Sequence, residues 1–321
     1  MKHIEYLVEK KQEGKNMKKN AIKVGVIIGL VLLLFGTSIS PIIQATSAQK
    51  EKSIYLRQKT TETKVGGDYW AVFVTTFEST FMYEALNTKP HWNTSHIKLL
   101  SMGNATKQNI LDALDWVIQH SDSDDIVVFA DNSHGTRKIT GECGIVPWDF
   151  DQEGMISTTE LNEKFDQINA KGLCLIFDCC FSGNFVDRQM SMGIQNILNF
   201  NSAIYRGIEG ENRVILMSTK RGGTGAFIGI TDPKTNQTTT IAFIKFVAEA
   251  FTNKIDYNND GTCSAEEAFR YAKKTFFPYS LFLFFNPLVQ LLSLINSGGF
   301  LILPFPTLYD SYDGELPIVT I

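Results

Sequence analysis

A histidine and a pair of adjacent cysteines could together form a nucleophile and its base. His134 is followed by Gly135, and Cys179 and Cys180 stand side by side further along the chain. A cysteine thiol is mostly protonated near neutral pH, so it needs a nearby imidazole to accept its proton before the sulfur can attack a substrate. These residue types therefore indicate thiolate chemistry, in which the histidine acts first as a general base and then as a general acid.

Both reactive groups come shortly after apolar runs, over residues 126–130 and 173–177. Short apolar runs that end abruptly in small and polar residues are typical of buried parallel strands, whose carboxyl ends meet at one edge of an α/β sheet. That edge is where α/β proteins bind ligands. We therefore expect His134 and Cys180 to meet there, because the sequence Ser133-His134-Gly135 is too polar and flexible for a buried structural position.

The rest of the chain alternates strands with helices. The hydrophobic pattern predicts further strands over 69–75, 96–100 and 213–218, and helices over 81–86, 107–120, 159–169 and 240–251. A hairpin and a turn are expected between His134 and Pro147. This alternation predicts an α/β fold with a mainly parallel central sheet covered by helices on both faces, in one domain over residues 66–321.

The composition is that of an ordinary globular protein. The chain has 321 residues, a hydrophobic content of 44% and a formal net charge of -4. No strong basic field is present, so nucleic acid is not an expected partner. Five cysteines are few for a disulfide scaffold, and their odd number leaves at least one thiol free or paired between chains.

The N-terminus has the layout of an export signal. Several lysines precede the uncharged stretch 24–43, and the small residues 45–48 follow at a spacing suited to cleavage. A cleaved signal peptide and an uncleaved anchor are both open, since about twenty apolar residues can span a bilayer. We expect residues 1–48 to be one or the other, residues 49–65 to be a linker, and the body to be exported, either extracellular or anchored facing outside.

Several of these segments resemble the caspase-like (clan CD) cysteine peptidases, most of all metacaspases and prokaryotic caspase-family proteins. The segments are 104–129, Ser133-His134-Gly135, Phe177-Asp178-Cys179-Cys180-Phe181-Ser182-Gly183, 266–272 and 308–317. The resemblance implies a caspase-like three-layer α/β/α sandwich and a cysteine-type endopeptidase that acts on protein or peptide substrates without an organic cofactor. It is also compatible with self-processing in the segment 184–213.

The same resemblance assigns roles to individual residues. It places the nucleophile two positions after the acid, which selects Cys180 and leaves Cys179 as a packing or redox neighbour. His134 would be the base, and the backbone N–H groups of Gly135 and Cys180 would form the oxyanion hole. The chain departs from the metacaspase pattern at Phe181, where a histidine often follows the nucleophile, and in the short loop 76–78, which lacks a frequent aspartate.

Specificity depends on the charges near the nucleophile. The resemblance implies that Asp178 lines the pocket for the substrate side chain beside the scissile bond, and we include Ser218 and Lys220 among the substrate-binding residues. A buried carboxylate would pair with arginine or lysine. If Lys220 and Arg221 turned inward, the pocket would instead prefer an acidic residue. We expect basic specificity, because such loop cations are usually solvated.

The segment 256–267 has the spacing of a calcium-binding EF-hand loop. Oxygen-bearing side chains stand at its first, third, fifth, ninth and twelfth positions, glycine is sixth, and a helix is expected to follow. The predicted metal ligands are Asp256, Asn258, Asp260, Thr262 at the seventh position, and Glu267. The structural alternative is a turn followed by a capping box between Ser264 and Glu267. The segment 149–160 repeats the spacing, but there helix capping is the expected role.

The segment 275–309 carries no charged residue and is rich in Phe and Leu. Prolines and glycines interrupt it too often for a regular spanning helix. Membrane contact, partner binding and an additional core layer are all open, and we expect membrane association through this segment and through 24–43. The alternative to an enzyme is therefore a non-catalytic, membrane-associated caspase-like scaffold, although the intact His134 and Cys180 favour the enzyme.

Overall fold

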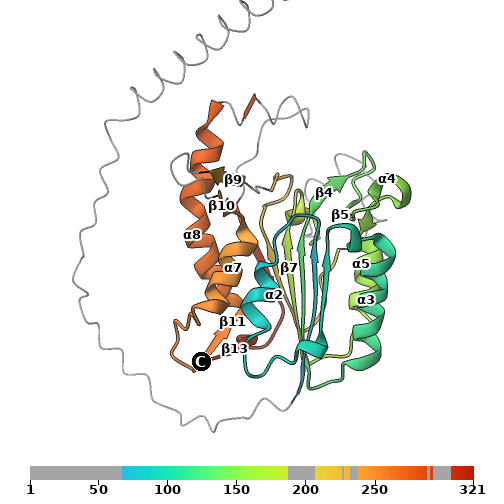
Figure 1. Cartoon of the computed structure of the whole chain (residues 1–321), viewed down its shortest axis with the longest axis vertical. Helices are drawn as coiled ribbons and strands as arrows, with labels where there is room; N and C mark the ends of the chain where they lie inside the picture. The colour runs from blue at the N-terminus through green and yellow to red at the C-terminus, as the bar shows by residue number, and fades with distance from the viewer. Residues whose placement is uncertain (1–66, 187–206, 226–227, 232–237, 288–289, 292–304) are drawn as a thin grey trace, which may run out of the picture. The chain divides into compact units, whose positions relative to one another are not determined.

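A computed structural model describes residues 67–186, 207–225, 228–231, 238–287, 290–291 and 305–321 (Figure 1). All of them fall within the unit Glu62–Ile321. The predicted signal or anchor segment 1–48 and the linker 49–65 lie outside the described residues. Among the described residues, none of the helices combines the length and the apolar character needed to cross a bilayer.

The centre of the fold is a six-stranded sheet with the order β12-β8-β7-β3-β1-β2. Its strands are β1 (Tyr69–Thr75), β2 (Ile97–Ser101), β3 (Ile126–Asn132), β7 (Gly172–Asp178), β8 (Arg213–Met217) and β12 (Thr307–Asp310). Neighbouring strands are parallel except for the edge pair β12 and β8, which is antiparallel. The mainly parallel sheet predicted from the sequence is therefore confirmed.

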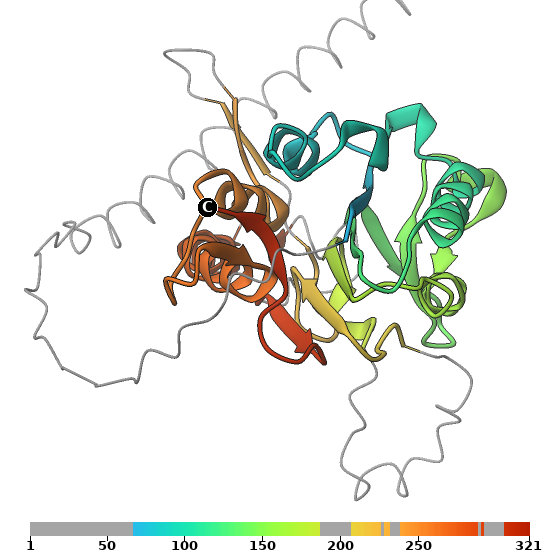
Figure 2. The ribbon, with the colours of Figure 1, turned by 90° about the horizontal axis from the view of Figure 1, so that it is seen from below.

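Helices cover both faces of this sheet. They are α2 (Phe81–Leu86), α3 (Lys107–His120), α5 (Thr158–Phe165), α7 (Phe243–Thr252) and α8 (Ala265–Phe285). Helices α3 and α5 lie on one face, and α2, α7 and α8 lie on the other, as the views in Figures 1 and 2 show. Every residue of β1, β3, β7 and β8 is buried, which explains why these strands are almost continuously apolar.

Several smaller elements lie outside the six-stranded sheet. They are the 3-10 turns η1 (Thr94–His96), η2 (Met102–Asn104) and η3 (Ser182–Asn184), the sheet of β4 (His134–Arg137), β5 (Cys143–Val146) and β6 (Ile156–Ser157), the short helix α4 (Phe150–Glu153), the pair β9 (Ile228–Thr231) and β10 (Thr238–Ile241), and the pair β11 (Thr262–Ser264) and β13 (Pro317–Thr320). The predicted hairpin after His134 corresponds to β4 and β5.

Some boundaries differ from those predicted. Strand β2 begins one residue later, and α5 ends at Phe165 rather than Asn169. Helix α7 begins at Phe243, because the preceding residues 238–241 pair with β9 instead. These shifts arise at element ends, where pairing with a distant strand decides the conformation and local hydrophobic periodicity does not.

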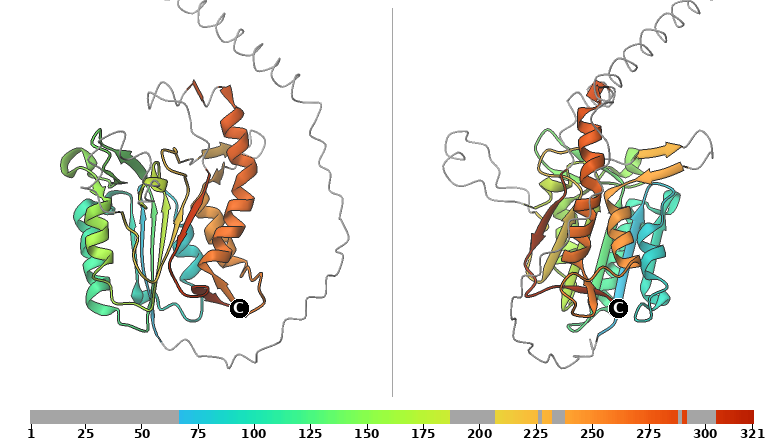
Figure 3. Two further views of the ribbon diagram at one scale, coloured as in Figure 1. Left: turned by 180° about the vertical axis from the view of Figure 1, so that it is seen from behind. Right: turned by 90° about the vertical axis from the view of Figure 1, so that its left-hand side faces the viewer.

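Helix α8 covers the first part of the segment 275–309 even though a proline lies inside it. Helix α8 continues through Pro278 to Phe285 and extends past the end of the sheet (Figure 3). Proline removes one backbone hydrogen bond, but here Phe276 is fully buried beside it. In addition, the Ser280 hydroxyl donates a hydrogen bond of 3.2 Å to the Phe276 carbonyl. Tertiary packing therefore holds the helix where the local sequence would interrupt it.

The two sides of the segment 187–206, which lies outside the described residues, are held together. The Ile208 N–H donates a hydrogen bond of 2.8 Å to the Phe185 carbonyl. The buried Arg213 guanidinium donates to the Ile208 carbonyl at 2.7 Å and forms an ion pair with Asp166 at 2.7 Å. Most of the segment predicted for self-processing therefore falls between two anchored points.

Candidate active site

Strand register brings the two predicted catalytic side chains to the same edge of the sheet. Asn132 at the end of β3 pairs directly with Asp178 at the end of β7. His134 and Cys180 each stand two residues beyond this pair. The His134 side chain is exposed and Cys180 is partly exposed, and the His134 ring packs against Phe77 with 5.2 Å between the ring centroids.

The backbone of Gly135 lies directly against Cys180. A Cβ atom added at Gly135 would stand 1.9 Å from the Cys180 carbonyl oxygen, so only glycine fits there. The backbone N–H groups of Gly135 and Gly225 both face the Cys180 sulfur, and their hydrogen bonds favour its thiolate form. Burial is the larger effect and raises the pKa of the Cys180 thiol above its usual value. The resting group is therefore a thiol that needs a base.

The adjacent cysteine has a different environment. Cys179 is buried in the apolar cluster beneath α3 and α5, and burial raises the pKa of its thiol well above the usual range. An inaccessible protonated sulfur cannot reach a substrate. Cys180 is the partly exposed member of the pair, and it lies in the turn that follows β7.

A loop after β8 supports the turn that carries Cys180. The Phe181 N–H donates to the Gly223 carbonyl at 2.8 Å, and the Thr219 N–H donates to the Ser182 hydroxyl at 3.2 Å. Phe181 has a φ of 62°, a strained conformation for a bulky residue that persists only when the surroundings fix it. Gly183 meets the backbone of Lys220 so closely that a Cβ atom would stand 2.2 Å from its carbonyl carbon.

The predicted specificity residue Asp178 is buried and already has partners. Its carboxylate accepts a hydrogen bond of 2.9 Å from the Ile244 N–H at the first turn of α7, and the Phe243 N–H also donates to it. The Ser218 hydroxyl lies close enough to lower the pKa of Asp178, and it donates to the Cys179 carbonyl at 3.5 Å. Ala242 at the start of α7 has no side-chain cap, so Asp178 satisfies these helix N–H groups from a distant strand. Burial raises the pKa of Asp178 to about 6, against the opposing effect of these hydrogen bonds.

The structure separates the three predicted substrate-binding residues. Ser218 is fully buried beside Asp178. Lys220 is exposed, and its ammonium group lies 5.6 Å from the centroid of the Phe305 ring. Arg221 is exposed as well. These two cations therefore do not join Asp178 and Ser218 in the interior.

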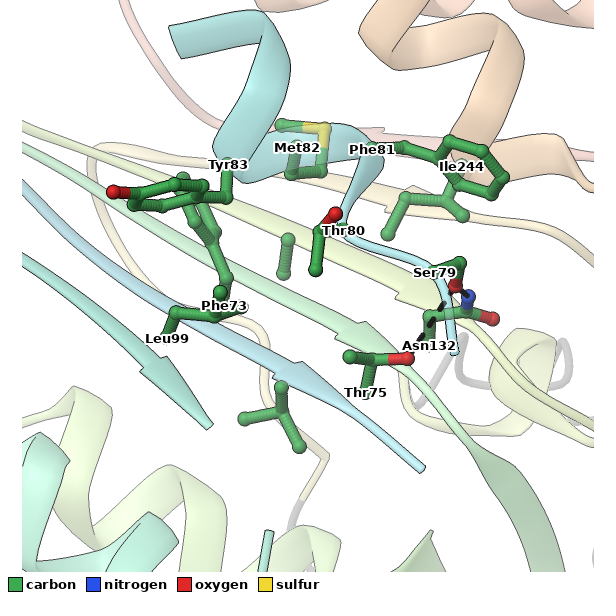
Figure 4. Close-up of a pocket in the computed structure, with 12 residues that line it drawn as sticks. Phe73, Thr75, Ser79, Thr80, Phe81, Met82, Tyr83, Leu99, Asn132 and Ile244 are labelled. Carbon is green, nitrogen blue, oxygen red and sulfur yellow. Dashed lines mark hydrogen bonds between the residues drawn. The ribbon is translucent and has the colours of Figure 1, made fainter. Parts of the chain in front are cut away.

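The pocket in Figure 4 lies between the sheet and α2, next to the Asp178 region. Asn132 and Ile244, which both neighbour Asp178, line it, and the Asn132 amide donates a hydrogen bond of 2.6 Å to the Ser79 hydroxyl. Its volume of about 20 Å³ is room for a single water molecule. A larger pocket of about 260 Å³ lies at the opposite edge of the sheet, near Arg213. Neither is an open substrate cleft beside Cys180.

The predicted calcium loop adopts a tight turn held by its own backbone. Asp256 accepts from the N–H groups of Asn259 at 2.6 Å and Gly261 at 3.1 Å. Gly261 has a φ of 88°, which suits glycine. Asn258 and Thr262 hydrogen-bond to the carboxylate of Asp260. The predicted ligands Asp256, Asn258 and Asp260 therefore lie in one turn.

The fifth predicted ligand, Glu267, is fully buried and engaged elsewhere. Its carboxylate accepts from the N–H groups of Tyr257 at 2.5 Å and Ser264 at 3.1 Å, while its own N–H donates to the Ser264 hydroxyl at 3.1 Å. This is the capping box named above as the structural alternative. The structure does not bring the predicted calcium ligands together as a carboxylate cluster. Among the described residues, such a cluster, with one oxygen atom from each residue within 4.8 Å of the others, is formed by Asp122, Asp124 and Asp125. The donor types suit calcium, but Glu267 would have to turn toward the ion.

The second segment with this spacing, 149–160, forms the expected cap. Ser157 is the N-cap of α5, and Glu160 completes a capping box with it. Glu160 also forms an ion pair of 2.7 Å with Lys107.

Sequence reasoning missed two supports of the site. The cap that Asp178 supplies to α7 depends on a contact between residues far apart in sequence, and no local pattern indicates it. The loop residues Gly223 and Gly225 were also not singled out, although the run Arg221-Gly222-Gly223-Thr224-Gly225 directly after a strand is a signal of close backbone approach. A Cβ atom at Gly225 would stand 3.0 Å from the Cys179 backbone.

The parallel sheet delivers a histidine-glycine pair and a glycine-supported cysteine to one edge, as the resemblance to caspase-like cysteine peptidases led us to expect. Comparison with protein families agrees. Residues 75–189 match the model described as "Metacaspase, peptidase C14 domain", and this segment contains both His134 and Cys180. Over residues 75–189 the chain is thus similar to the caspase-like (clan CD) peptidases of the metacaspase type.

Curated relatives show the same similarity over a limited length. The chain is 34% identical over 95 residues to "Inactive metacaspase-4" of Trypanosoma brucei brucei, which covers 26% of this chain and 27% of that protein. It is 33% identical over 100 residues to "Metacaspase-1" of Plasmodium berghei, covering 29% and 16%. It is 35% identical over 107 residues to "Metacaspase-1" of Botryotinia fuckeliana, covering 30% and 26%. The matched segment is therefore a minor part of each relative's own length.

Proposed function

We propose that this protein is a cysteine endopeptidase that hydrolyses peptide bonds with His134 and Cys180. The observation that carries the proposal is the close approach of Gly135 to Cys180, which puts a backbone N–H against the sulfur at the sheet edge. A buried structural cysteine needs no such donor, whereas a nucleophile does. One curated relative bears the name of an inactive protein, so activity has to be measured on this chain, through the variants considered in the Discussion.

The reaction follows from the placement of these groups. His134 removes the proton from the Cys180 thiol, and the thiolate attacks the carbonyl carbon of the scissile bond. The N–H groups of Gly135 and Cys180 bind the oxygen as it becomes negative. The imidazolium of His134 then gives its proton to the leaving amine, and water hydrolyses the acyl-enzyme. Because burial holds Cys180 as a thiol, the proton transfer to His134 is required rather than optional.

We further propose that the enzyme prefers arginine or lysine before the scissile bond. Asp178 is buried near Cys180, and the exposed positions of Lys220 and Arg221 leave its charge uncompensated by either cation. A substrate cation would add a charged partner to the backbone donors that already hold Asp178. Cleavage of a peptide series with Arg, Lys, Asp or Asn at this position measures the preference, and cleavage only after Asp would overturn it.

This specificity predicts a pH dependence. Since the pKa of Asp178 is raised to about 6, the carboxyl group is neutral in mildly acidic solution and ionised above it. We expect kcat/KM for an arginine peptide to rise as the pH passes through about 6. We also expect this rise to be absent in Asp178→Asn, which can still accept the Ile244 hydrogen bond. Ionisation of Asp178 favours catalysis but opposes folding. Because the pKa of Asp178 is raised to about 6 in the folded state, protonation favours that state, and stability is lost as the pH increases from about 4 through 6.

We also propose calcium binding at the loop 256–267, on the basis of its oxygen donors and its glycine turn. Binding would require Glu267 to exchange its backbone partners for the ion. Calorimetric titration of the chain with calcium should release or absorb heat and raise the melting temperature, and Asp256→Asn should weaken both effects. Asp151→Asn, in the segment 149–160, is the matched control. A titration without heat and without a thermal shift removes calcium from the proposal.

We propose membrane association as well, through the uncharged segments 24–43 and 275–309. In the described part, Phe282 and Phe285 on α8 are 63% and 73% exposed, and aromatic side chains of this kind favour the membrane interface. Phe285→Trp should be quenched by brominated lipids in vesicles, whereas Ile139→Trp, also exposed, should not. Equal quenching of the two would exclude α8.

A non-catalytic membrane scaffold is the second candidate function, and it predicts vesicle binding without peptidase activity. An exported location, extracellular or anchored facing outside, goes with this proposal.

A further inference from the structure

A buried acid lies beneath the proposed oxyanion site and has no role in the mechanism above. Asp131 is fully buried near the end of β3, on the face opposite Asn132. One of its oxygens, Oδ2, lies 2.9 Å from the Ser133 hydroxyl. The other, Oδ1, has no hydrogen-bond partner of standard geometry among the described residues, although the Cys179 thiol faces the carboxyl group.

The Ser133 hydroxyl has a second short contact. Its oxygen lies 2.9 Å from the carbonyl oxygen of His134, and Ser133 is 4% exposed, so water does not compete freely there. A hydroxyl has one proton and can donate to only one of these two acceptors. If it donated to Asp131, the His134 carbonyl would face an oxygen without a hydrogen between them.

Both contacts become hydrogen bonds if Asp131 is the neutral acid. Its O–H then donates to the Ser133 oxygen, and Ser133 donates to the His134 carbonyl. Burial and the nearby charge of Asp178 raise the pKa of the Asp131 carboxyl well above its usual range. The unpartnered Oδ1 agrees, since a buried carboxylate with an unsatisfied oxygen is costly. The chain of donors therefore runs from Asp131 through Ser133 to the His134 carbonyl.

We infer that Asp131 and Ser133 are positioning residues that orient the Gly135 N–H toward Cys180. The His134 carbonyl and the Gly135 N–H belong to one planar trans peptide unit and point in opposite directions. A hydrogen bond that holds the carbonyl on one side therefore fixes the direction of the N–H on the other. That N–H faces the Cys180 sulfur. This inference rests on the proposed function, in which the same N–H also binds the developing oxyanion.

Ser133→Ala tests the inference by removing the donor to the His134 carbonyl. We expect kcat to fall about tenfold with KM little changed, less than the 10²–10³-fold loss on removing an oxyanion donor outright. Ser121→Ala is the matched control, because the buried Ser121 hydroxyl likewise donates to a backbone carbonyl, that of Val117, at 2.9 Å. A fall in both variants, or in neither, overturns the inference.

A comparison of two substitutions tests the hydrogen-bonding role of Asp131. Asp131→Asn keeps a donor for Ser133, whereas Asp131→Ala does not, so the asparagine variant should retain several-fold more activity when both have melting temperatures above the assay range. Equal activity of the two variants contradicts a hydrogen-bonding role.

A readout without substrate separates this inference from the proposed function. The alkylation rate of Cys180 by iodoacetamide, followed by mass spectrometry of its peptide, reports how well the thiolate is stabilised. We expect it to be several-fold slower in Ser133→Ala than in the unmodified chain and in Ser121→Ala. A slower rate in a chain without peptidase activity would leave the inference standing and refute the proposed function, whereas an unchanged rate refutes the inference.

Discussion

Cys180→Ala should abolish peptidase activity, with a loss of at least about 10³-fold in kcat/KM, because the sulfur that forms the acyl-enzyme is gone. The reason lies in accessibility. Cys180 is partly exposed and faces two backbone N–H groups, whereas the neighbouring Cys179 is buried. Hydrolysis of an arginine peptide measures the effect. Any self-processing within the segment 184–213 should also stop, which denaturing electrophoresis would show as an intact chain.

Cys179→Ala is the matched control, since it removes a neighbouring sulfur of the same type. Cys179 is 2% exposed and packs in the apolar cluster under α3 and α5. We expect its loss to lower the free energy of unfolding by about 1 kcal/mol while the peptidase activity persists. Activity that survives Cys180→Ala, or that disappears only in Cys179→Ala, would falsify the assignment of the nucleophile.

Gly135→Ala should be the next most damaging substitution. The added Cβ atom would stand 1.9 Å from the Cys180 carbonyl oxygen and 2.9 Å from the Cys180 nitrogen. Both are backbone atoms, so the clash cannot be relieved by a side-chain rotation. The two strand ends must separate, and a displacement of about 1 Å between reacting groups costs on the order of 10² in rate. We expect kcat/KM to fall by at least that factor and the melting temperature to fall as well.

Gly103→Ala provides the comparison for the cost of a methyl group. A Cβ atom at Gly103 would meet only the Trp148 indole nitrogen, at 3.8 Å, which is an ordinary contact. This variant should retain the activity and thermal stability of the unmodified chain. If Gly135→Ala behaved in the same way, the close approach of Gly135 to Cys180 could not be what builds the site.

Much of this architecture can be predicted from the sequence, because buried parallel strands have a recognisable pattern of short apolar runs. The runs that became β1, β3 and β7 are apolar on both faces and end in polar residues, so the strand ends and the edge they share follow directly. Because His134 and Cys180 both follow the carboxyl ends of parallel strands, they are expected at the same edge of the sheet. Their roles remain predictions until activity is measured.

Other features could not be predicted, since they depend on contacts between distant parts of the chain. Nothing in the local sequence of α7 shows that Asp178 caps it, because the helix begins at an alanine that has no capping side chain. Helix α8 passes through Pro278 because of packing around Phe276, and local propensity favoured an interruption. The calcium motif is ambiguous for a related reason: the carboxylate spacing that suits an ion also suits a helix cap, and Glu267 can satisfy either.

The hydrogen bond between Phe185 and Ile208 has a consequence for how a cut chain would behave. Strand β8 lies between β7 and β12, so the piece that begins near residue 207 contributes an interior strand, while Arg213 ties it to Asp166. A break within 187–206 would therefore leave a two-chain complex with the same hydrodynamic size as the intact protein. Once unfolded, however, the pieces would have to find each other in solution, so refolding would become dependent on concentration.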